Sequence, residues 1–198
     1  MMTTIQNDIP KARINHKLAY LLLGFAVSIL IRVLIGSPDI GASALAGLVF
    51  AACLVVLAGA EKPITTATLQ TFGWGVLGTV VVFVPIAIFQ ADSISMHARP
   101  AGNYAIWSLV VTVVAVAEEY FLRGAFYESI NLKYGVFVAI IVGAVAFAGL
   151  HVPLYGWNIV PLDFVVGIWL GTLRYYSGSW TSPAVTHVAA DLGAWWII

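Results

Sequence analysis

The chain consists of long apolar runs that are separated by short polar stretches. A bilayer core of ~30 Å requires about 20 apolar residues of helix, and seven runs approach that length. They are roughly Leu18–Gly36, Ile40–Ala60, Leu69–Phe89, Tyr104–Tyr127, Tyr134–His151, Ile159–Tyr176 and Ser182–Ile198. Lipid accepts only segments that close their backbone hydrogen bonds internally, and the runs lack the period-two alternation of a barrel. The pattern therefore predicts an all-α, polytopic transmembrane helical bundle with about seven spans.

The composition supports a membrane protein and excludes several other classes. Hydrophobic residues make up 61% of the chain and charged residues 9%, so there is too little polar surface for a soluble globule. The net charge is zero and no basic run occurs, which argues against a nucleic-acid partner. Cys53 is the single cysteine, so an intramolecular disulfide and a CxxC site are excluded. The expected partner of most of the surface is the lipid bilayer.

A polar stretch from Gln90 to Asn103 divides the chain into two expected regions. Residues 1–103 form an N-terminal region of three spans with a cytoplasmic tail, and residues 104–198 form a four-helix C-terminal core. With the N-terminus in the cytoplasm, six Lys and Arg residues fall inside and two outside when Arg123, which lies within a span, is left out, and this favours the orientation. Arg32, near the end of the first span, is expected to extend towards the membrane interface.

The fourth span contains three charged residues, which are costly in a membrane. Glu119 and Arg123 are spaced i, i+4 on one helix face and are expected to form an ion pair. Glu118 points about 100° away and has no such partner in the span. A buried carboxylate without a cation beside it is suited to general base chemistry. The alternative is a purely structural cluster in which all three groups are paired.

Two further spans contain histidines that can reach the same depth. His187 and Asp191 are spaced i, i+4 on the seventh span, and His151 ends the fifth. If the helix hairpin turns near Tyr134, Glu118 and His151 both lie ~24 Å from the turn. A turn nearer Asn131 would offset them by roughly 10 Å, which helix tilt would have to absorb. We therefore expect one polar pocket that contains all four side chains.

The sixth span contributes residues that we interpret as structural. Asp163 lies early in this span and is expected at the membrane interface rather than in the pocket. Gly167 and Gly171 have the spacing of a close helix contact.

Glutamates, histidines and an aspartate within a membrane suit the activation of water for peptide hydrolysis, with stabilisation of an oxyanion. The sequence does not fit three other kinds of intramembrane protease. A zinc enzyme needs H-E-x-x-H, a rhomboid-type enzyme needs Gly-x-Ser-Gly, and a presenilin-like enzyme needs Tyr-Asp with Gly-x-Gly-Asp; none occurs.

Residues from about Tyr104 to Ile198 resemble the CPBP family, which comprises type 2 CaaX-prenyl proteases and bacteriocin-processing (Abi) membrane proteins. Three motifs match in order, each on its own predicted span. The motifs are E-E-x-x-x-R at Glu118, Glu119 and Arg123, F-x-x-x-H at Phe147 and His151, and H-x-x-x-N/D at His187 and Asp191. Many relatives have Asn where this chain has Asp191.

The resemblance implies a glutamate-dependent intramembrane endopeptidase. By analogy, Glu118 and His151 activate the attacking water, while His187 and Asp191 bind the oxyanion or orient its donor. Arg123 holds Glu119. These six residues are the expected catalytic site.

The family also suggests what the enzyme uses and cleaves. We expect catalysis without a metal or other cofactor. The expected substrate is a membrane-embedded or membrane-anchored protein or peptide: a CaaX tail, a bacteriocin leader or a C-terminal sorting helix. The expected location is the cell membrane of a bacterium or archaeon, with the pocket nearer the extracytoplasmic face. The alternative function is a non-catalytic transporter, scaffold or immunity protein with a buried charge network.

Overall fold

The computed structural model describes residues 11–36, 40–59, 68–88 and 103–197, and within them all regular structure is helical. The α-helices are α1 (Lys11–Ile35), α2 (Ile40–Gly59), α3 (Leu69–Ile88), α4 (Tyr104–Glu119), α5 (Tyr127–Tyr134), α6 (Val136–Tyr155), α7 (Val160–Ser177) and α8 (Thr181–Ile197). A π-helix, Tyr120–Phe126, joins α4 to α5, and a 3₁₀ turn, Trp157–Ile159, precedes α7. The predicted all-α bundle is confirmed.

The described helices correspond to the seven predicted spans, because α4, the π-helix and α5 form one continuous rod. Three segments are long and apolar enough to cross a membrane by length and composition: Ile14–Ile35, Tyr104–Tyr134 and Val136–Tyr155. Shorter apolar helices cover Ser43–Gly59 and Leu69–Phe83. The fourth span extends past its expected end to Tyr134, and the fifth continues to Tyr155. The polar stretch from Gln90 lies almost entirely outside the described residues.

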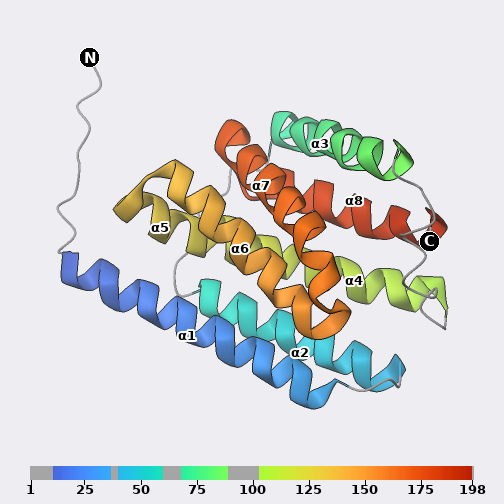
Figure 1. Ribbon diagram of the computed structural model, residues 1–198, viewed down its shortest axis with the longest axis horizontal. Coiled ribbons are helices and arrows are strands. Elements are labelled where there is room, and N and C mark those ends of the chain that lie inside the picture. Colours follow the sequence, from blue (N-terminus) through green and yellow to red (C-terminus); the bar gives the residue numbers. More distant parts are fainter. Residues whose placement is uncertain (1–10, 37–39, 60–67, 89–102, 198) are drawn as a thin grey trace.

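Helices from both ends of the chain surround the segment that contains Glu118. Figure 1 shows α1 and α2 on one side of the bundle and α3 on the opposite side, with α4 to α8 between them. Helix α2 packs against α4, and α3 packs against α8 and α7. Thr186 of α8 donates a 2.8 Å hydrogen bond to the carbonyl oxygen of Gly75 in α3. The division at residue 103 stays a prediction.

The hairpin between α5 and α6 turns where the sequence analysis expected. Helix α5 ends at Tyr134, and Gly135 has a φ of 86°, which a residue with a Cβ rarely adopts. Helix α6 begins at the next residue. The turn near Tyr134 is therefore confirmed.

The glycines of α7 allow this helix to approach α6 closely. A Cβ on Gly167 would lie 2.8 Å from the Cα of Ala144, and one on Gly171 would lie 3.2 Å from Ile140. These contacts confirm the expected packing role of the two glycines. They also fix the position of α7 relative to α6, and thus of the site residues on both helices.

The distribution of side chains is inverted relative to a soluble domain. Large apolar residues such as Leu34, Leu109 and Phe137 are at least 70% exposed, whereas Arg123 and Glu119 are essentially fully buried. An apolar surface around a charged interior is the arrangement expected in lipid. The protein is an integral membrane protein.

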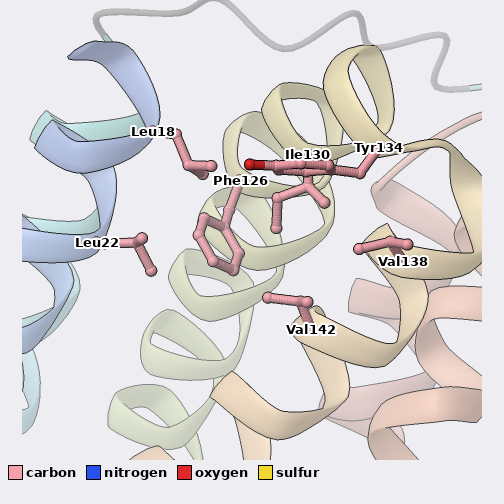
Figure 2. A pocket seen from close by; sticks show the side chains of 7 residues that line it. All are labelled: Leu18, Leu22, Phe126, Ile130, Tyr134, Val138 and Val142. Carbon is pink, nitrogen blue, oxygen red and sulfur yellow. The ribbon is translucent and has the colours of Figure 1, made fainter. Parts of the chain in front are cut away.

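The outer surface contains shallow apolar hollows. One hollow of about 150 Å³ lies between α1 and the α5–α6 hairpin. Figure 2 shows that Leu18 and Leu22 of α1 face Phe126, Ile130 and residues of α6 across it. A larger hollow of about 340 Å³ follows α6 and the start of α7, and its lining includes Val152, Trp157 and Phe164. Both linings are almost purely apolar and suit contact with hydrocarbon.

Candidate active site

A π-helix follows directly after the two glutamates of α4. π-Helices are rare in proteins, and those that occur are frequently found at functional sites. Arg174 of α7 donates through Nε to the carbonyl oxygen of Arg123, 2.8 Å away, and through Nη2 to Glu128 at 3.1 Å. Arg174 is therefore a buried support for the π-helix, which its place in the sequence did not indicate.

Glu119, Arg123 and His187 form a group that we term the closed cluster. The Oε1 atom of Glu119 accepts a 2.7 Å hydrogen bond from Arg123 and lies 3.0 Å from Nδ1 of His187. The three side chains are 0%, 1% and 6% exposed. Arg123 also donates to the carbonyl oxygen of Gly167, 3.1 Å away. The predicted Glu119–Arg123 pair is confirmed, and it ties the π-helix to α7 and α8.

His187 has a closer carboxylate partner than the one expected. Its Nε2 atom lies 3.5 Å from Oδ2 of Asp191, one turn further along α8. The shorter contact, at Nδ1, is to Glu119, which is fully buried, whereas Asp191 is 38% exposed. The expected His187–Asp191 contact is therefore present, Glu119 is a second and closer partner of the ring, and the orienting role of Asp191 stays a prediction. Spacing along one helix predicted the i, i+4 contact but not the neighbour from α4.

Glu118 has a cationic partner, contrary to the sequence-based expectation. Arg32 Nη1 donates to Oε1 of Glu118 at 3.3 Å, and the two side chains are 17% and 2% exposed. The guanidinium also lies over the ring of Phe50, 4.7 Å from its centroid. Arg32 therefore points into the bundle rather than to the membrane interface. The physical reason is that a buried carboxylate stabilises an arginine more than an apolar surface does.

His151 and Asp163 face each other across the α6–α7 junction. Nδ1 of His151 lies 2.9 Å from Oδ2 of Asp163, and the side chains are 13% and 14% exposed. The ring N–H is not aligned with the oxygen, so the contact is close without being an aligned hydrogen bond. The ring of Tyr155 lies beside that of His151, with centroids 5.6 Å apart and the ring planes tilted by 40°. We term His151, Asp163, Tyr155 and Asp191 the open cluster.

Asp163 is a residue that the sequence analysis assigned to the interface and left out of the site. The short gap in the sequence between the two predicted spans, residues 152–158, could have located it. The connection after Gly156 is a single 3₁₀ turn, Trp157–Ile159, so the first turn of α7 must lie beside the last turn of α6. His151 is in that last part of α6 and Asp163 in the first turn of α7.

Phe147 explains the spacing of the F-x-x-x-H motif. Its ring meets those of His151 and His187 edge to face, with centroids 4.9 Å and 5.2 Å apart. The guanidinium of Arg123 lies over the same ring at 4.9 Å. Phe147 thus packs against both imidazoles and fixes one side of each.

The three sequence motifs converge at Asp191. Its carboxylate interacts electrostatically with His187 on its own helix, with Glu118 of α4, with His151 of α6 and with Asp163 of α7. Four helices therefore supply charged or titratable groups to one location. That Glu118, His151 and Asp191 form one catalytic pocket stays a prediction.

The donor groups do not have the geometry of a metal site. Within the residues that the structure describes, no group of three His, Cys, Asp or Glu side chains could hold a metal ion. Oε1 of Glu119 already contacts Arg123 and His187, and Nδ1 of His151 faces Asp163. We therefore derive no step through a metal.

The fold and site together define an integral membrane protein with a buried cluster of carboxylates, histidines and arginines. Residues 100–193 match the Rce1-like family, described as "Type II CAAX prenyl endopeptidase Rce1-like". The CPBP resemblance is thereby confirmed over these residues, which contain all three motifs. By its description, this is a family of endopeptidases. Arg32 lies outside the matched segment. The comparisons with curated proteins and with solved structures found no match.

Proposed function

We propose that this protein is a glutamate-dependent intramembrane endopeptidase in which Glu118 is the general base. The observation that carries the proposal is that the bundle encloses Glu118, His151 and His187, which are 2%, 13% and 6% exposed. Each of these side chains comes from a different helix, and an apolar bundle has no packing reason to collect them. The Rce1-like match supports the reaction class.

The attacking nucleophile is a water molecule between Glu118 and His151. Glu118 accepts a proton from this water while the water oxygen forms a bond with the carbonyl carbon of the substrate. Asp163 restrains the His151 ring, so that its Nε2 atom is available to the same water. The proton on Glu118 then passes to the leaving nitrogen. The C–N bond breaks, and the products are a carboxylic acid and an amine.

The closed cluster stabilises the negative charge on the tetrahedral intermediate. Glu119 accepts from Nδ1–H of His187, which orients the ring. Nε2–H of His187 then points towards the Asp191 side, where it donates to the oxyanion. Arg123 fixes Glu119 and does not touch the substrate. Asp191 limits the orientations that the ring can adopt.

The substrate is a membrane-embedded or membrane-anchored peptide, and a prenylated CAAX peptide is the first candidate because of the family match. We further propose that the protein lies in the cell membrane of a bacterium or archaeon. Its N-terminus is in the cytoplasm, and the site is nearer the extracytoplasmic face. The excess of Lys and Arg on one side supports this orientation.

The experiment uses purified protein in lipid vesicles that contain a farnesylated CAAX peptide. Mass spectrometry in H₂¹⁸O should detect a shortened peptide with ¹⁸O in its new carboxylate, and treatment with o-phenanthroline should leave the rate unchanged. A second reaction contains a peptide with a C-terminal sorting helix. If neither peptide is cleaved, the proposed activity is wrong and the transporter or scaffold alternative gains support. If the chelator abolishes cleavage and added zinc restores it, the metal-free mechanism is contradicted.

A further inference from the structure

The first helix supplies a charged residue to the candidate active site. Arg32 lies in the last turn of α1, and its Nη1 atom donates to Oε1 of Glu118 at 3.3 Å. Glu118 is the proposed base, so this contact reaches the centre of the proposed chemistry. The match to the endopeptidase family begins only at residue 100 and leaves Arg32 without an assigned role.

Two contacts from the N-terminal helices fix where Arg32 lies. Its guanidinium packs over Phe50 of α2, a side chain with 0% exposure. About two helical turns before Arg32, Phe25 of α1 stacks on Phe121 of the π-helix, with ring centroids 5.1 Å apart. Phe121 follows Glu118 by three residues. Helix α1 is therefore held against the same segment that positions Glu118.

Arg32 supplies positive charge to a site that is rich in carboxylates. Four carboxylates gather here, from Glu118, Glu119, Asp163 and Asp191. Arg123 is committed at short distance to Glu119 and to the carbonyl oxygen of Gly167. Without Arg32, Glu118 would lie 2% exposed among like charges, which is strongly unfavourable for a buried carboxylate.

The length of the contact distinguishes Arg32 from Arg123. Charge-assisted hydrogen bonds are usually about 2.7–2.9 Å long, and the Arg123–Glu119 bond at 2.7 Å is of this kind. The 3.3 Å bond from Arg32 to Glu118 is longer and therefore weaker. A weak, oriented contact holds the carboxylate in place without preventing it from accepting a proton.

We infer that Arg32 is a positioning residue for the proposed hydrolysis: it orients the Glu118 carboxylate from outside the family-matched segment. The inference rests on the proposed role of Glu118. It means that α1 completes the active site, and that residues 100–193 alone lack one of its parts.

The test compares kcat and KM for Arg32→Gln, Arg32→Lys and the control Leu34→Gln, with the farnesylated peptide in vesicles. Leu34 is on the same helix end and is 74% exposed, so its variant should match the wild type. Loss of a hydrogen bond to a charged group should reduce kcat of Arg32→Gln about 10- to 100-fold, with KM within about threefold. The kcat of Arg32→Lys should lie between those of the wild type and Arg32→Gln, because lysine keeps the charge but not the planar donor.

A second measurement needs no substrate. Thermal unfolding of Arg32→Gln, Glu118→Gln and the double variant gives the coupling between the two side chains. The double variant should be more stable than the sum of the single effects predicts, because it leaves no unpaired charge. Additive effects would overturn the inference.

The outcomes separate the inference from the proposed function. Wild-type kcat in Arg32→Gln, or a change in KM alone, overturns the positioning role even if Glu118→Gln is inactive. Full activity of Glu118→Gln overturns the proposed function instead. If Arg32→Gln does not fold, Arg32→Lys decides: a kcat equal to the wild type counts against positioning, and a reduced kcat supports it.

Discussion

The closed cluster and the open cluster are neighbours in space but differ in how much solvent and substrate can reach them. In the closed cluster, Glu119, Arg123 and His187 are at most 6% exposed and contact one another at 2.7–3.0 Å. In the open cluster, His151 and Asp163 are 13–14% exposed and Asp191 is 38% exposed. The same residue types therefore serve two purposes. Tight, sealed pairs hold helices and orient one imidazole, whereas looser, accessible groups can meet a water and a peptide.

Glu118 and Glu119 show this contrast within two consecutive residues. Glu119 has a short contact to a cation on its own helical segment, and Glu118 has a long one to a cation from α1. Helical rotation of about 100° sends the two carboxylates to different neighbours. Adjacent glutamates are thus not interchangeable, and the predictions below separate them.

The largest effect is expected from breaking the closed cluster at Arg123. The Arg123→Met variant leaves Glu119 buried without its cation, which costs about 3–5 kcal/mol. The yield of monodisperse protein after detergent extraction should fall sharply. Lys133→Met is the matched control, because Lys133 is exposed at the end of α5 and should give a normal yield. Normal yield and thermal stability of Arg123→Met would show that the closed cluster does not hold the fold.

The next largest effect should distinguish the two carboxylates beside His187. Glu119→Gln should reduce kcat more than Asp191→Asn, because Glu119 is buried at 3.0 Å from the ring and Asp191 is partly exposed at 3.5 Å. We expect a difference of at least about tenfold, or ~1.4 kcal/mol. Cleavage rates of the two folded variants check this. A larger loss in Asp191→Asn would return the orienting role to Asp191.

A smaller effect is expected at Asp163. Asp163→Asn keeps an oxygen that can face His151, so it should lose only a few-fold in kcat, whereas Asp163→Ala should lose about tenfold or more. Long-range ¹H–¹⁵N spectra of ¹⁵N-histidine protein should show a change in the ring signals of His151 between the wild type and Asp163→Ala. Unchanged His151 ring signals and an unchanged rate in Asp163→Ala would make this contact irrelevant to catalysis.

The sequence was sufficient for the features that depend on local spacing or overall hydropathy. The seven spans of the described residues, the turn beside Tyr134 and the Glu119–Arg123 pair follow from apolar run length, a glycine at a helix end and i, i+4 geometry. The three motifs likewise predicted a common location for Glu118, His151 and Asp191, because helices of known rise from a known turn reach calculable depths.

Features that depend on helix rotation and on distant packing could not be predicted in this way. Arg32 and Glu118 are 86 residues apart, and nothing in the first span fixes which way its end faces. The π-helix depends on Arg174 of α7, 51 residues beyond the carbonyl group that it contacts. The contact between Asp163 and His151 was not predicted, because the position of Asp163 near a span end suggested only the interface, whereas the short turn before α7 places it beside His151.

The most direct test of the central claim is the cleavage rate of Glu118→Gln. The variant is nearly isosteric with the wild type and removes the base without adding volume. Its cleavage rate is measured in vesicles, with Glu128→Gln as the control. Glu128 lies further along the same continuous helical rod and forms a partly exposed ion pair with Arg174. If Glu118 is the general base, folded Glu118→Gln loses at least about 100-fold in kcat, while Glu128→Gln stays within a few-fold of the wild type. Wild-type cleavage by folded Glu118→Gln would contradict the account.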